Sequence, residues 1–153
     1  MVIWYKCCHV IVNNYLFSAI AGNLMKPDEF SNYRHFLGQS QRNLADLLGT
    51  SLRSVQAYEQ GWRDIPPNIE RMILYLLYQK QLGQKSVEPC WKIKKCPIRW
   101  RDKCIVYNYR GRGPCWFVHG TFCEGKKQRS WIEKMETCRR CSIFIRIVGS
   151  KVC

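Results

Sequence analysis

The sequence predicts a mainly α-helical bundle over residues 26–80. A linker over 81–89 joins this bundle to a small irregular module over 90–145, which is held together by metal ions or disulfide bonds. Two observations predict this division. Apolar residues recur every three or four positions in the first half, as in amphipathic helices. Seven of the ten cysteines lie between Cys90 and Cys141, a density typical of modules with too little apolar core to fold unaided.

Residues 1–25 read as an N-terminal extension and residues 146–153 as a tail. The extension is apolar in patches and resembles a weak secretory signal, but Asn13 and Asn14 interrupt it. No stretch approaches the ~20 apolar residues of a membrane span. We therefore expect translation to start at Met25, with the preceding segment a gene-start artefact or a disordered extension.

Positive charge is concentrated in the cysteine-rich half. Residues 1–78 hold seven Lys and Arg against six Asp and Glu, whereas residues 79–153 hold eighteen against five. An excess of this size favours a polyanionic partner, most simply nucleic acid. A metal site of four thiolates carries a charge of about −2, so two such sites would still leave this half basic.

Four helices are expected in the first half. Pro27 opens the first helix, because proline suits the first helical turn, and Gly38 ends it. The second helix runs over residues 41–48 after the capping residue Ser40. The inward-facing residues expected in these two helices are Phe30, Tyr33, Phe36, Leu37, Leu44, Leu47 and Leu48, with Ala45 leaving room for a crossing helix.

Gly49 supplies the turn before the third helix, because glycine enters the left-handed region without steric cost. Thr50 or Ser51 caps that helix, which runs over residues 52–60 and stops at Gly61. The fourth helix follows a pair of prolines. The expected inward residues are Val55 and Tyr58 in the third helix and Ile69, Met72, Ile73, Leu76 and Leu77 in the fourth.

Residues 26–80 resemble the phage-repressor (Cro/Xre) helix-turn-helix family. The likeness rests on Leu37-Gly38-Gln39-Ser40-Gln41, Leu44-Ala45, Leu47-Leu48-Gly49-Thr50-Ser51, Val55, Tyr58-Glu59 and Gly61. It implies double-stranded DNA as partner, with the third helix in the major groove, and homodimerisation is usual in that family.

The resemblance also assigns residues to the DNA. It places Leu52, Arg53, Gln56 and Ala57 against the bases, and Gln41, Ser51, Ser54 and Arg63 are candidates for phosphate contacts. Arg53 is the strongest candidate, because a guanidinium can grip O6 and N7 of guanine, a contact that discriminates by about 1–3 kcal/mol. Gln56 could serve adenine similarly. The family typically has polar residues where Leu52 and Ala57 stand, so contacts with thymine methyl groups replace some hydrogen bonds.

The cysteine-rich half contains a degenerate repeat. The segments 90–93 and 115–118 each start with Cys-Trp and continue with a β-type pair, which suggests two similar loops. Cys138 and Cys141 form the only C-x2-C. The expected metal ligands are Cys90, Cys96, Cys104, Cys115, Cys123, Cys138 and Cys141. His119 or Cys153 would complete a second four-ligand site, although His119 is otherwise expected to be a surface histidine.

This half is similar to the cysteine-rich two-CW modules of bacterial proteins. The likeness rests on Cys90-Trp91, Cys96-Pro97, Cys104, Cys115-Trp116, Gly120-Thr121, Cys123, Cys138 and Cys141. It implies an architecture that occurs fused to signalling or DNA-binding domains, and no established reaction.

Three chemical interpretations of the cysteines are open. The favoured interpretation is zinc or a [4Fe-4S] cluster, because cytosolic thiols stay reduced. A module with little hydrophobic core also needs a structural metal centre to fold. The second is a redox pair, Cys138 and Cys141, whose thiol pKa values Arg139 and Arg140 would lower. The third is a structural disulfide module.

The aromatic residues among the basic ones are expected to form part of the hydrophobic core in preference to stacking on bases. They are Trp91, Trp100, Tyr107, Tyr109, Trp116 and Trp131.

Together these features predict a cytoplasmic, nucleoid-associated and sequence-specific DNA-binding transcriptional regulator. Its module would brace the fold or report redox or metal status. The alternative is a protein-interaction adaptor whose helical bundle docks a partner and whose cysteine module is a scaffold. We expect no enzyme, membrane contact or small-molecule substrate, since no phosphate-binding glycine loop, H-E-x-x-H or G-x-S-x-G is present. Because the bundle is almost neutral, phosphate neutralisation must come from a homodimer or from the basic half.

Overall fold

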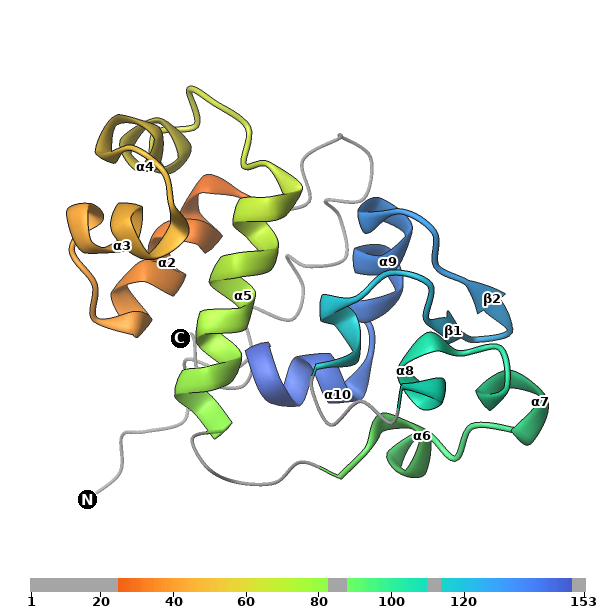
Figure 1. Cartoon of the computed structure of the whole chain (residues 1–153). Coiled ribbons are helices and arrows are strands. Elements are labelled where there is room, and N and C mark those ends of the chain that lie inside the picture. Colours follow the sequence, from red (N-terminus) through yellow and green to blue (C-terminus); the bar gives the residue numbers. More distant parts are fainter. Residues whose placement is uncertain (1–24, 83–87, 110–113, 150–153) are drawn as a thin grey trace, which may run out of the picture.

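Helices dominate the chain (Figure 1). The computed structural model describes residues 25–82, 88–109 and 114–149. The predicted extension up to residue 24, residues 83–87 of the predicted linker, and the end of the predicted tail with Cys153 lie outside them. The described part is mainly helical with one two-stranded sheet. No helix in it combines the length and the apolar character needed to cross a bilayer.

The four helices expected in the first half are present. They are α2 (Pro27–Leu37), α3 (Gln41–Leu48), α4 (Leu52–Glu59) and α5 (Pro67–Leu82). Ser40 and Ser51 are confirmed as the caps of α3 and α4, since their hydroxyls accept hydrogen bonds from the backbone N–H of Asn43 and Ser54 at 3.1 and 3.0 Å. The helix α5 continues two residues into the segment predicted as linker.

Two glycines make the tight turns between these helices. Gly38 after α2 has φ 72° and Gly49 after α3 has φ 61°, the left-handed region in which a side chain would be strained. The backbone N–H of Gly49 donates to the carbonyls of Ala45 and Asp46. Only Thr50 and Ser51 then separate this residue from α4, so α3 and α4 cross at short range.

Two inward-facing residues were predicted wrongly. Leu47 of α3 is 48% exposed and Met72 of α5 is 38% exposed. In α5 the buried face is instead Ile69, Glu70, Ile73, Leu74 and Leu77. The face is rotated because the cysteine-rich half also packs against α5, a contact between distant segments that helical periodicity in the first half cannot reveal. Phe36 and Leu76 lie at the edge of the core, partly buried.

The second half consists of short elements. Three helices of one turn come first, α6 (Cys90–Ile93), α7 (Ile98–Arg101) and α8 (Ile105–Asn108), followed by the 3-10 turn η1 (Cys115–Phe117). The strands β1 (Phe122–Cys123) and β2 (Lys126–Lys127) form an antiparallel hairpin whose turn residues Glu124 and Gly125 both have positive φ, as a type I′ turn requires. Then come α9 (Trp131–Cys138), α10 (Ser142–Phe144) and the π-helical turn η2 (Ile145–Gly149).

The two Cys-Trp segments, which the repeat predicts to be similar loops, are short helical turns. Cys90 begins α6 and Cys115 begins η1, each directly after a proline. Pro89 and Pro114 stand at the N-caps with ψ of 141° and 117°, and the helical turns begin at the cysteines that follow them. Of the two indoles, that of Trp116 is buried and that of Trp91 packs edge-on against Tyr107.

One hydrophobic core contains side chains from both halves. Tyr75 and Tyr78 of α5 contact Phe117 and Trp116 of η1, with ring centroids 5.1 and 6.4 Å apart. The turn η2, which includes residues predicted as tail, packs against α5 with Ile147 and Val148 buried. The cysteine-rich half therefore covers α5, whereas α3 and α4 lie on the other side of that helix (Figure 1).

Candidate nucleic-acid interface

The helix α4 presents a polar face to solvent. Arg53 and Gln56 are exposed, and Leu52 and Ala57 beside them are partly exposed. Their opposite neighbour Val55 is fully buried. Arg53 makes no hydrogen bond or ion pair with another described residue. All four residues predicted to contact bases therefore lie on the accessible side of α4, with the guanidinium of Arg53 unengaged.

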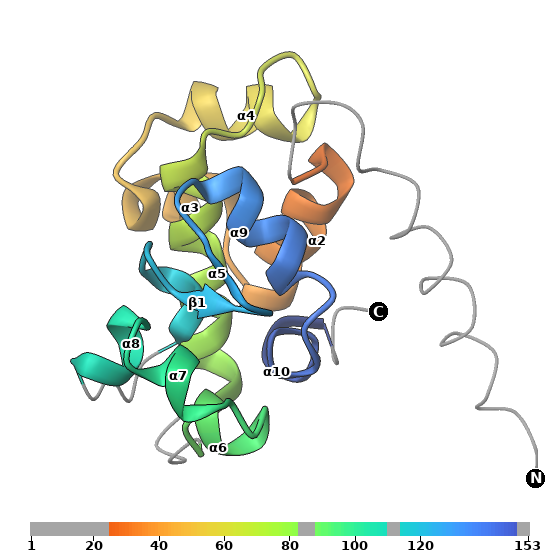
Figure 2. The same cartoon turned by 90° about the vertical axis from the view of Figure 1, so that its right-hand side faces the viewer.

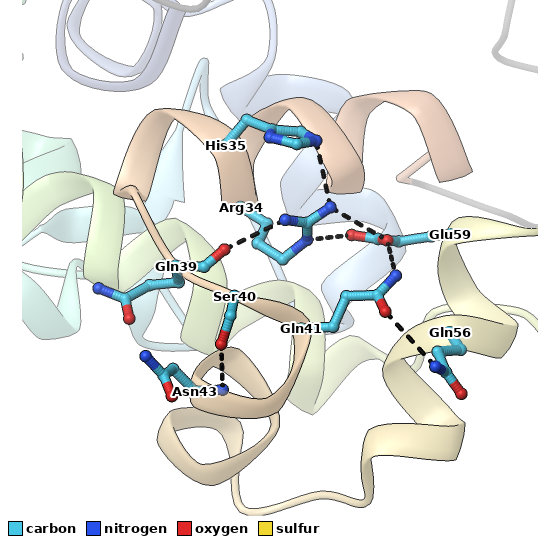
Figure 3. A network of polar contacts seen from close by, with 8 residues as sticks. All are labelled: Arg34, His35, Gln39, Ser40, Gln41, Asn43, Gln56 and Glu59. Atoms are coloured by element: carbon cyan, nitrogen blue, oxygen red, sulfur yellow. Dashed lines mark hydrogen bonds and ion pairs between the residues drawn. The ribbon is translucent and has the colours of Figure 1, made fainter.

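A partly buried polar network fixes α4 relative to α2 and α3 (Figure 3). Glu59 accepts hydrogen bonds from Arg34 Nε at 2.5 Å and from Gln41 Nε2 at 2.6 Å, and its side chain is 7% exposed. Burial alone would raise the pKa of Glu59, but the hydrogen bonds from Arg34 and Gln41 and the charge of Arg34 outweigh it, and the pKa is lowered. The Glu59 carboxylate thus ties three helices together.

The residues predicted to contact phosphates are placed differently from one another. Gln41 joins the network, since its amide donates to Glu59 and its oxygen accepts from Gln56 Nε2 at 3.5 Å. Ser51 caps α4 and shares a hydrogen bond between hydroxyls with Ser54 at 2.9 Å. Arg63 is exposed in the turn after α4 and has no hydrogen-bonded partner among the described residues. The phosphate contacts stay a prediction, and Arg63 is the freest of the four.

The cysteines of the second half lie near one another. The thiol of Cys90 in α6 lies close enough to that of Cys115 in η1 to raise the pKa of Cys115. Cys138 lies close enough to Cys115, Cys123 and Cys141 for their charges to raise its pKa. None of the seven described cysteines is in a disulfide.

Burial makes several of these thiols weak acids. The hydrogen bond with Cys90 and burial raise the pKa of Cys115 well above its usual value. Burial raises the pKa of Cys123 to about 11 and that of Cys138 further still. The expectation that the intervening arginines would lower the pKa values of the C-x2-C pair is therefore wrong for Cys138. The largest cause is burial of the Cys138 thiol, and Arg139 is engaged with Glu29 and Glu70.

Arg139 joins the two halves. Its Nη1 donates to Glu29 of α2 at 2.8 Å and its Nη2 donates to Glu70 of α5 at 2.9 Å. The Glu70 side chain is 1% exposed and also accepts from Trp131 Nε1 at 2.8 Å. Burial raises the pKa of Glu70 even against the charge of Arg139 and the indole hydrogen bond. Sequence reasoning missed this ion pair, because it joins residues 110 and 69 positions apart.

A second buried cation lies among the thiols. The Lys134 side chain is fully buried, and its ammonium donates to Thr121 Oγ1 at 2.5 Å. Its charge lowers the thiol pKa values of Cys115, Cys123 and Cys138, although burial outweighs it in each. No salt bridge pairs Lys134 with a carboxylate of the described residues.

The described side chains form no ready metal site. In residues 25–82, 88–109 and 114–149, no three or more His, Cys, Asp or Glu are arranged to hold an ion. His119 is exposed, as expected of a surface histidine, and hydrogen-bonds to Arg71 of α5. Zinc or a [4Fe-4S] cluster at the seven cysteines stays a prediction.

The predicted core role of the aromatic residues holds for two of the six. Trp116 and Trp131 are buried, whereas Tyr109 is 80% exposed.

No family model, no curated protein and no solved structure matches the chain. Its function is therefore inferred from its own geometry.

Proposed function

We propose that the chain is a sequence-specific DNA-binding transcriptional regulator in which α3 and α4 form a helix-turn-helix. The observation that carries the proposal is the accessible face of α4, where Arg53 is exposed with no partner among the described residues. A helix of this kind fits the major groove, and its early outward residues reach the base edges. Arg53 is the second residue of α4, which supports that role.

The scaffold behind α4 supports the same role. Base readout needs a helix held at a defined angle, because discrimination depends on bidentate hydrogen-bond geometry. The Glu59 carboxylate, held by Arg34 and Gln41, supplies that rigidity from the inner side of the helix (Figure 3). Ser51 fixes the start of α4.

The test is selection of bound duplexes from a random-sequence library, followed by fluorescence anisotropy on the selected duplex. Arg53→Ala should weaken binding to the selected duplex by about 1–3 kcal/mol, which is roughly 5- to 150-fold in Kd. The matched control is Arg140→Ala, which removes an exposed arginine at the end of α9. Equal affinities of the two variants, or no duplex enriched by the library, would refute the proposal.

One observation favours the adaptor as a second candidate. Trp62, in the turn after α4, is 80% exposed, and Leu47 of α3 is 48% exposed. Contiguous patches of exposed apolar side chains mark protein interfaces, and a partner that covers Trp62 is what the adaptor would require. Absence of duplex binding even at low salt, with Trp62→Ala abolishing capture of a protein partner, would favour this candidate over the regulator.

For the cysteine-rich half, the proposal includes a metal centre with a structural or sensing role. The closeness of Cys138 to Cys115, Cys123 and Cys141 supports it, although these side chains do not form a ready site. Elemental analysis of the purified chain separates the choices. Brown protein with iron and sulfide indicates a cluster, colourless protein with stoichiometric zinc indicates a structural site, and absence of both refutes a metal centre.

A further inference from the structure

A small segment of the second half is strongly basic. Residues 88–109 contain six Lys and Arg and two Asp and Glu. Five of these cations are exposed and have no salt bridge to a described carboxylate. We call them the basic end. They are Lys92, Lys94, Lys95, Arg99 and Lys103.

The backbone beneath the basic end is anchored. Trp100 of α7 packs against Phe122 of the hairpin, with ring centroids 6.4 Å apart. Arg101 turns inward, and its Nε donates to the carbonyl of Cys96 at 2.7 Å. Trp91 of α6 packs on Tyr107 of α8 at 5.3 Å. The three short helices are thus held to one another and to the hairpin, so their cations are presented on a fixed frame.

The basic end lies far from the face of α4. In Figure 1, α4 is at the upper left and α6 and α7 are at the lower right. Figure 2, turned by 90°, again shows α4 at the top and α6 and α7 at the bottom. The helix α5 and the shared core lie between them. A duplex against α4 therefore lies at the other end of the fold from α6 and α7.

We propose that the basic end is a second DNA contact surface, which binds the phosphates of a separate duplex without sequence preference. The proposal rests on the proposed function, because α4 is taken to hold the first duplex. Exposed charges act over about one Debye length, ~8 Å at physiological salt, so these cations cannot neutralise the phosphates that α4 meets. The near-neutral bundle then recognises the DNA sequence through α4, and the basic end binds the phosphates of a neighbouring DNA segment.

The first test measures the salt dependence of binding to a fluorescein-labelled duplex of random sequence. The duplex has about 20 base pairs, far below the persistence length, so it cannot bend from one end of the protein to the other. The variant Lys92→Gln/Lys94→Gln/Arg99→Gln should reduce the slope of log K against log salt by about 0.9 for each phosphate that the variant no longer neutralises. The control Lys26→Gln/Arg129→Gln/Arg140→Gln removes three exposed cations elsewhere and should leave the slope unchanged.

The second test asks whether one chain holds two duplexes. Beads carrying a biotinylated copy of the same duplex are loaded with the full chain, washed, and offered the fluorescein-labelled copy. The wild-type chain and the control variant should capture the labelled duplex, and the basic-end variant should not.

The outcomes separate this proposal from the regulator. If the basic-end variant has the same slope of log K against log salt as the control variant, the basic end is not a DNA surface, whatever the effect of Arg53→Ala. If the slope is reduced but the wild-type chain does not capture the labelled duplex, the proposal of a second bound duplex is overturned. A reduced slope and capture, combined with no sequence preference in the library selection, support the basic end and refute the regulator.

Discussion

Replacing Arg139 should destabilise the whole protein, because this residue is the charged link between its two halves. The guanidinium bonds Glu29 and Glu70 at 2.8 and 2.9 Å, and the Glu70 side chain is 1% exposed. Arg139→Met leaves Glu70 buried with only the indole of Trp131 as partner. Loss of one member of a buried ion pair costs about 3–5 kcal/mol. Because the Arg139 side chain is itself 20% exposed, we expect the lower end, about 3 kcal/mol.

The measurement is urea unfolding followed by tryptophan fluorescence and circular dichroism. A loss of about 3 kcal/mol is a large share of the roughly 5–15 kcal/mol typical of a domain, and it should lower the midpoint by roughly 1–2 M urea. Arg140→Met is the matched control, because the neighbouring arginine is exposed and its loss should cost less than about 0.5 kcal/mol.

Two further comparisons test the reason for the loss. In Arg139→Met the buried Glu70 should take up a proton. Acidification toward about pH 5 should therefore reduce the difference in unfolding free energy between this variant and the wild type. Adding Glu70→Met to Arg139→Met should restore at least half of the lost stability, because a buried carboxylate without its cation is the main penalty. The reasoning is refuted if Arg139→Met matches Arg140→Met, or if Glu70→Met makes Arg139→Met still less stable.

Three further outcomes are expected. Arg34 and Gln41 lower the pKa of Glu59 in the folded chain, and His35 adds to the effect. The Glu59 carboxylate therefore stabilises the fold at pH values above its unfolded-state pKa near 4.5, and this stabilisation is lost as the pH falls through the folded-state pKa. Glu59→Gln should shrink the difference in urea midpoint between about pH 7 and about pH 3, and an unchanged difference would contradict the network. Ser51→Ala removes the cap of α4 and should cost about 1 kcal/mol in urea unfolding, whereas a neutral effect would show that the cap is dispensable. Burial raises the pKa of Cys138, so iodoacetamide at about pH 8 should alkylate this thiol in the unfolded chain and spare it in the native one, as mass spectrometry of the digested protein can show; rapid native labelling would contradict its burial.

Much of the first half could be predicted from the sequence because its signals are local. The bounds of α3, the caps Ser40 and Ser51, and the left-handed Gly49 all depend on residues within four positions along the chain. The accessible side of α4 follows from the burial of Val55 and Tyr58 in its own helix. Each of these features is decided by a helical turn or a cap, which the sequence displays directly.

Only the tertiary structure decided how the halves meet. Glu70 is buried because η1, α9 and η2 pack against its side of α5, whereas Met72 lies outside that contact and is exposed. Arg139 binds Glu29 and Glu70 because α2 and α5 bring these carboxylates to it, and burial raises the pKa of Cys138. Which thiols become neighbours depends in the same way on long-range packing. Contacts between segments separated by tens of residues leave no periodicity in the sequence, since either partner alone looks like an ordinary polar or thiol side chain.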